Sequence, residues 1–187
     1  MAVRNADNIL IGGGRVFIVT PGEGTGSTPT YTELGWLQGE IKTEVQGNSQ
    51  AIKESEGGTV HTIATDTETH FTFSLLEANL DTLKSLYPSS GELNDSNSGT
   101  GFAIGTFQSD NTSQFEFWHK KRSGGYRCLR IFKGKISGTF TPLIINQDNA
   151  SVIPIDIVAL ADETKSTSQN LAEIFDTTAA NAPGGGW

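Results

Sequence analysis

The residues that could do acid–base or metal chemistry are few and scattered. His61, His70 and His119 include no i, i+4 pair and no HExxH motif, the spacing that places two imidazoles on one helix face. Cys128, the single cysteine, lies in the strand-like run YRCLRIF, where a small buried side chain is a better interpretation than a nucleophile. We therefore expect no catalytic residue, no metal site and no cofactor-binding residue.

Two glycine-rich segments have only a superficial likeness to nucleotide-binding loops. Residues 22–28 lack the lysine with which a Walker loop reaches the phosphates. Residues 99–105 have dinucleotide-like glycine spacing, but no strand–helix–strand unit surrounds them. No GxSxG elbow is present, and the neighbouring carboxylates Glu54 and Glu56 lie in a polar stretch typical of a solvated loop. A small hydrolase is accordingly the weakest functional hypothesis.

The composition favours one β domain that builds surface. Of the 187 residues, 35% are hydrophobic and 22 are glycine, a balance that many short strands and turns would give. Ten Phe, three Tyr and three Trp are more aromatic residues than a disordered chain carries. No apolar run approaches the roughly 20 residues of a membrane helix, and the N-terminus has no signal-peptide core. We expect a protein made and folded in a cytoplasm, without membrane insertion.

The net charge of −8 is unevenly distributed. Residues 120–135 contain seven basic residues and no acid, so the rest of the chain carries −15. Such a basic strip could bind nucleic acid, but the acidic character of the whole chain argues against it. A contact with an acidic face of a neighbouring copy is the better hypothesis, and some of these positions are expected to be ordinary solvent-facing strand residues.

Period-two patterns predict a series of strands. They are expected at residues 15–20, 39–46, 59–65, 68–75, 101–108, 114–121 and 126–135. Between the second and third, residues 47–58 are expected to form a long exposed loop. Leu76, Leu80 and Leu83 have helical spacing and predict one short helix, with Leu80 at the centre of its buried face.

The strongest strand signal lies in residues 133–164, which predict a hairpin. Ile136 and Phe140 alternate with polar residues in its first half, and Ile153, Ile155 and Ile157 do so in its second. We expect these five side chains to form sheet core. The predicted organisation is an extended N-terminal arm at 1–14, a domain at 15–164, and a C-terminal extension at 165–187. Leu171, Ile174 and Phe175 predict a short helix in that extension, before a Gly-rich tail.

The order of these parts resembles a known family. A strand runs directly into a helix at TFSLLEANLDTL, residues 72–83, and later come GKISGTF and IPIDIVALAD. This order is similar to that of the major tail proteins, or tail tube proteins, of long-tailed bacteriophages. Those proteins share a strand–helix step and a closing strand with an apolar-Pro-apolar step. The resemblance covers roughly residues 1–164, with MAVRNADN and Leu34-Gly35-Trp36 also fitting.

The resemblance implies a mainly β fold, an antiparallel β-sandwich with one short flanking helix. It implies hexameric rings whose inner strands join neighbours into a β-barrel, and rings that stack into a hollow tube through which genomic DNA passes into the host. The implied partners are further copies of the chain, the tape measure protein, and the tail terminator and distal tail proteins. The implied location is the virion, after synthesis in the host bacterial cytoplasm. We expect the strip at 120–135 to face a neighbour or the outside and not the DNA channel.

Two alternatives remain open. One is the inner tube protein of a contractile tail or a related injection system. The other is a monomeric β-sandwich that binds a carbohydrate or cell surface, with Trp36, Trp118 and Trp187 as exposed contact residues.

Overall fold

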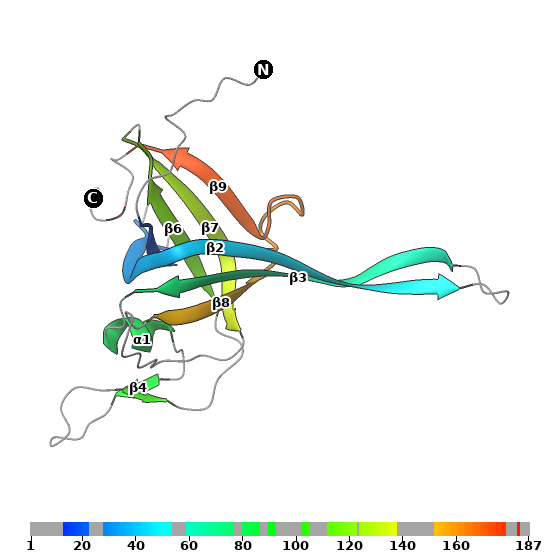
Figure 1. Ribbon diagram of the computed structural model, residues 1–187, viewed down its shortest axis with the longest axis horizontal. Helices are drawn as coiled ribbons and strands as arrows, with labels where there is room; N and C mark the ends of the chain where they lie inside the picture. Colours follow the sequence, from blue (N-terminus) through cyan, green and yellow to red (C-terminus); the bar gives the residue numbers. More distant parts are fainter. Residues whose placement is uncertain are drawn as a thin grey trace.

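The computed structural model describes residues 13–22, 28–53, 59–76, 80–86, 90–92, 102–104, 112–122, 124–137, 152–178 and 183 (Figure 1). Its elements are β1 (Arg15–Thr20), β2 (Thr30–Lys53), β3 (Thr59–Leu75), α1 (Leu80–Leu86), β4 (Ser90–Glu92), β5 (Phe102–Ile104), β6 (Ser113–Lys120), β7 (Tyr126–Ser137), β8 (Ile153–Leu160) and β9 (Ala172–Thr177). The expected mainly β fold with one short helix is confirmed. Residues 1–12 of the predicted N-terminal arm, Phe140 and Trp187 lie outside the described residues.

Seven strands form a single antiparallel sheet, not the two stacked sheets of the predicted sandwich. Their order is β6-β1-β2-β3-β8-β7-β9, and β6 also pairs with β7. The pairings β1–β2–β3–β8–β7–β6 therefore return to β1 and close a barrel (Figure 1). Closure pairs strand edges that would otherwise be exposed. The strands β4 and β5 pair with each other in a separate two-stranded sheet.

The barrel interior is filled by side chains that alternate along each strand. Buried members of this core include Val16, Leu34, Phe71, Phe73, Leu75, Phe115, Phe117, Ile131, Ile153, Ile155 and Ile157. The predicted core role of the three isoleucines of β8 is thus confirmed, while Ile136 is only partly buried at the margin. On β7, a Cβ at Gly134 would lie 2.6 Å from the ring of Phe115. The glycine lets β7 approach β6 closely where the barrel closes.

A second buried layer covers the outer face of β1, β6 and β7. It contains Phe17, Trp118, Tyr126 and Cys128, with Tyr31 and Phe175 packed against them. The carbohydrate-binding alternative expects Trp118 to be exposed, but its side chain is only 2% exposed. Strand β6 is therefore buried on both faces.

The helix α1 follows β3 closely and lies beside the end of β3 and the start of β8 (Figure 1). It begins at Leu80, later than predicted, and buries Leu83 and Leu86 in the barrel core. Leu76 precedes the helix and is 39% exposed, so the prediction that it docks the helix is wrong. Its backbone N–H instead donates to the carbonyl oxygen of Trp36. The side chain of Leu80 lies outside the described residues.

Two further predictions are corrected. Residues 172–177 form β9, antiparallel to β7, and not a helix, so part of the predicted C-terminal extension belongs to the sheet. Residues 47–53 continue β2, and only 54–58 of the predicted loop remain outside the described strands. The two strands predicted at 59–65 and 68–75 are one strand, β3.

Candidate assembly surface

The ends of β2 and β3 extend beyond the barrel as a two-stranded ribbon. The last β3–β8 pair is Thr69 with Ala159, and past it β2 and β3 remain paired with each other as far as Lys53 and Thr59. We call residues 46–53 and 59–68 the ribbon; Figure 1 shows it projecting away from the other strands. At 3.3 Å per residue, eight paired residues reach about 25 Å from the barrel.

Neither strand of the ribbon has a second neighbour within the described part of the chain. Strand β2 pairs with β1 only between Thr30 and Trp36, and β3 pairs with β8 only from Thr69 onward. Each ribbon strand therefore presents backbone N–H and C=O groups along an outer edge. Such edges readily accept a strand from another chain.

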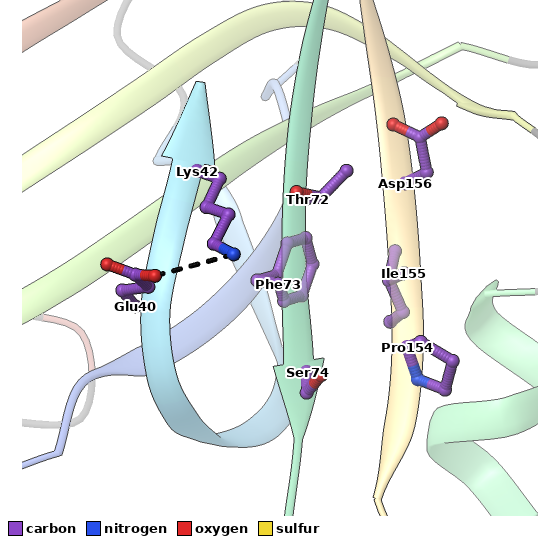
Figure 2. Close-up of a pocket in the computed structure, with 8 residues that line it drawn as sticks. All are labelled: Glu40, Lys42, Thr72, Phe73, Ser74, Pro154, Ile155 and Asp156. Atoms are coloured by element: carbon purple, nitrogen blue, oxygen red, sulfur yellow. Dashed lines mark ion pairs between the residues drawn. The ribbon is translucent and has the colours of Figure 1, made fainter. Parts of the chain in front are cut away.

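A bulge interrupts β2 shortly after its last pair with β1 and before the ribbon begins. The register with β3 shifts between Gln38 and Lys42, and Gly39 has a φ of 78°, a conformation that favours glycine. The bulge and strands β3 and β8 line a pocket of about 280 Å³. Figure 2 shows Glu40 and Lys42, 3.5 Å apart, on one side of this pocket and Pro154 to Asp156 on the other. Its charged groups are an exposed ion pair and one carboxylate, a set suited to polar contacts.

Close to this pocket, His70 lies between two carboxylates. Its Nδ1 is 3.1 Å from both side-chain oxygens of Asp156 on β8, and its Nε2 is 3.5 Å from Glu68 on β3. Burial alone would lower the pKa of His70, but the hydrogen bond to Asp156 and the charge beside it outweigh burial, and the pKa is raised above 6.5. Nothing in the sequence pattern brings His70 and Asp156 together; only the β3–β8 pairing does.

The predicted basic strip is partly neutralised within the chain. Arg127 Nε and Lys121 Nζ lie 2.8 and 3.0 Å from the carboxylate of Asp176 on β9. The hydrogen bonds from Arg127 and Lys121 hold the pKa of Asp176 far below its usual range. Lys133 lies 4.0 Å from Asp162. Basic residues of the strip thus bind β9 and the segment before it. The helix predicted at this position gave no indication of these contacts.

Arg130 connects β9 to a buried carboxylate. Its Nε is 2.6 Å from Glu116 and its Nη1 is 2.7 Å from Glu173. Glu116 is 0% exposed and also accepts a hydrogen bond of 2.8 Å from the indole N–H of Trp118. A buried carboxylate needs such partners, because an unpaired one would strongly destabilise the fold. No local sequence signal identifies Glu116 as buried, because its partner Arg130 lies on a different strand, β7.

The side chains singled out for binding or reactivity are mostly enclosed. Trp118 is buried, and Trp36 is partly buried with the Arg15 guanidinium 4.5 Å from its ring centroid. These two tryptophans therefore form no exposed platform of the kind that the carbohydrate-binding alternative requires. Cys128 is fully buried, and burial raises the pKa of its thiol, which keeps it protonated and unreactive. His119, on β6, has its Nδ1 3.0 Å from the carbonyl oxygen of Lys120.

Within the described residues, no group of three His, Cys, Asp or Glu side chains is arranged to hold a metal ion. The same part of the chain contains no helix long and apolar enough to cross a membrane. The sequence matches no protein-family model and no curated protein.

Proposed function

We propose that this chain is a structural subunit of a bacteriophage tail tube. Copies assemble into hexameric rings, the rings stack into a hollow tube, and genomic DNA passes through it without sequence-specific binding. The tape measure, terminator and distal tail proteins are the other partners of this proposal, and the virion is its location. The proposal begins from the resemblance at the strand–helix step and the closing strand. The ribbon is the structural observation that supports it most.

The ribbon supports self-association because an isolated pair of strands is only marginally stable. A two-stranded hairpin is marginally stable in water by itself, and this one continues well past its last contact with β8. Pairing with another copy would satisfy its edge groups and cover exposed apolar side chains such as Val45, which is 65% exposed at the root. A contact made by one copy on a different surface of the next is head-to-tail, and such contacts generate rings or filaments.

The closed barrel also supports the proposal. Its strands are paired around the barrel, so it can act as a rigid body that holds the ribbon in a fixed direction. The net charge of −8 also suits a DNA conduit, because a predominantly acidic wall repels phosphate and prevents adhesion.

Negative-stain electron microscopy of the purified chain, over a series of rising concentrations, tests the proposal. We expect six-fold rings or hollow tubes. A chain that stays a dispersed monomer at every concentration would contradict the proposal. In that case, tryptophan fluorescence titrated with cell-surface glycans would test the binding-module alternative, for which partly buried Trp36 is the remaining described candidate.

A further inference from the structure

The imidazole of His70 lies at the point where the ribbon leaves the barrel. It is one residue from Thr69, whose pair with Ala159 is the last between β3 and β8. Its side chain points to the outer face, because Phe71 beside it is buried in the core. Only 13% of the His70 side chain is exposed, although it is polar and stands on the outer face.

Every charged group that faces His70 from the neighbouring strands can be named. Asp156 on β8 and Glu68 on β3 contact its two nitrogens, as given above. Glu44 on β2 stands directly opposite His70 in the strand register. The cations are farther away: Lys42 is opposite Thr72, and Lys135 on β7 is opposite Val158, which separates it from His70. The imidazole thus sits in a predominantly acidic environment.

The hydrogen-bonding capacity of the two ring nitrogens restricts the favourable protonation states of His70 more than the surrounding charges do. A neutral imidazole has one N–H donor and one lone pair. If Nδ1 carries the hydrogen, Nε2 directs its lone pair toward Glu68; if Nε2 carries it, Nδ1 directs its lone pair at both oxygens of Asp156. Nε2 is also buried, with the Glu68 carboxylate 3.5 Å away. Only the doubly protonated ring presents an N–H to both carboxylates.

We propose that His70 is a pH-sensitive clamp that, when doubly protonated, ties the root of the ribbon to β8. Loss of one proton replaces an attractive contact with a lone pair facing a carboxylate, and the β3–β8 pairing at Thr69 and Ala159 loosens. The clamp acts within one chain and does not depend on the proposed tail tube function.

The sign of the effect follows from the raised pKa of His70. The protonated ring binds its proton more tightly in the folded chain than in the unfolded one. The clamp therefore contributes its full stabilisation below about pH 6.5, the ordinary histidine value, and loses it as the pH rises through the higher folded value.

Two measurements on the full-length chain test the clamp. The first is an NMR titration of the histidine side chains, assigned with His70→Gln and His119→Gln. We expect the His70 pKa to lie above 6.5. A value at or below 6.5 overturns the proposal.

The second measurement is hydrogen exchange of peptides covering 69–75 and 153–159, compared below and above the measured His70 pKa after correction for intrinsic exchange. The root should exchange roughly two- to fivefold faster at the higher pH, the change expected from losing one ion pair. His70→Gln, which can donate to Asp156 but cannot titrate, should show no such pH dependence, and His119→Gln should keep it. Equal protection of the wild-type root at both pH values overturns the proposal. If His70→Gln fails to fold, the wild-type titration and exchange still decide the question.

Discussion

The barrel and the ribbon are built from the same two strands but are stabilised in different ways. In the barrel, β3 is paired on both sides, with β2 and β8, and β2 passes from pairing with β1 to pairing with β3. Side chains such as Leu34, Phe71 and Phe73 are buried there in a common core. In the ribbon the same strands keep only their pairing with each other. Burial of apolar side chains therefore stabilises the barrel end of these strands, and the pairing of β2 with β3 continues along the other end.

This difference indicates that the barrel end and the ribbon end of β2 and β3 have different roles. A region with a filled core and paired strands needs nothing further to be stable. A region with two open edges gains stability by contact with another chain. Changes in the ribbon should consequently alter association, and changes in the barrel should alter folding.

Shortening the ribbon should give the largest and most selective effect. Replacing residues 47–67 with Asn-Gly joins Gln46 to Glu68, which are paired in the sheet, through a two-residue turn. We expect rings and tubes to disappear in negative-stain images. The free energy of unfolding of the monomer should change by less than about 1 kcal/mol, because the barrel core is untouched. Tubes of normal appearance from the shortened chain would show that the ribbon is dispensable for assembly.

A core substitution should have the opposite selectivity. Ile157 is 0% exposed, and Ile157→Ala should lower the free energy of unfolding by roughly 2–5 kcal/mol in urea denaturation. The matched control is Val45→Ala at the root of the ribbon, where the side chain is 65% exposed and the loss should stay within about 0.5 kcal/mol. Equal losses at the two positions would show that the core and the ribbon are not energetically distinct.

The buried carboxylate of the outer layer should rank next. Glu116→Gln keeps the shape of the side chain but removes the charge that Arg130 and Trp118 contact. We expect a loss of roughly 3 kcal/mol in the free energy of unfolding, near the lower end for a broken buried pair because Arg130 retains Glu173. Glu33→Gln is the control: Glu33 is 41% exposed and 3.3 Å from Arg15, and its loss should stay below about 1 kcal/mol. Similar losses for the two variants would mean that Glu116 is not a structural charge.

The sequence predicts the strands of the barrel better than those of the ribbon. Alternating apolar residues identify β8 and its pairing with β7, because a buried face leaves a period-two pattern. In the ribbon, the turn-forming residues Gly47 and Asn48 are typical of a loop. Only the cross-strand register with β3 makes this segment a strand, and register is not visible in a local pattern.

Local sequence patterns also do not predict the contacts of the candidate surface. Leu171, Ile174 and Phe175 have the spacing of a helix face, but Ile174 is 69% exposed and Phe175 packs on Trp118. The acids of β9 contact cations of β7 that lie more than forty positions away in the chain, so no local pattern reveals these contacts. His70 and Asp156, eighty-six positions apart, are brought together in the same way.

Strand β9 is intermediate between the two regions, and it offers the smallest and most specific test. It has one paired edge, along β7, and its exposed Asp176 is bound by Arg127 and Lys121. Because these partners lower the pKa of Asp176, its stabilising contribution is complete above about pH 3.8 and is lost only as the pH falls through the lower folded value.

In hydrogen exchange at mildly acidic pH, Asp176→Asn should therefore make peptides covering 172–177 exchange faster, while peptides of β8 stay protected. Glu163→Gln, at an exposed position between β8 and β9, is the matched control and should leave β9 unchanged. Unaltered protection of β9 in the Asp176 variant would mean that its backbone pairing with β7 is sufficient. In that case a strand paired with the barrel along one edge would already behave like the barrel, and the lack of any pairing with a barrel strand would be what sets the ribbon apart.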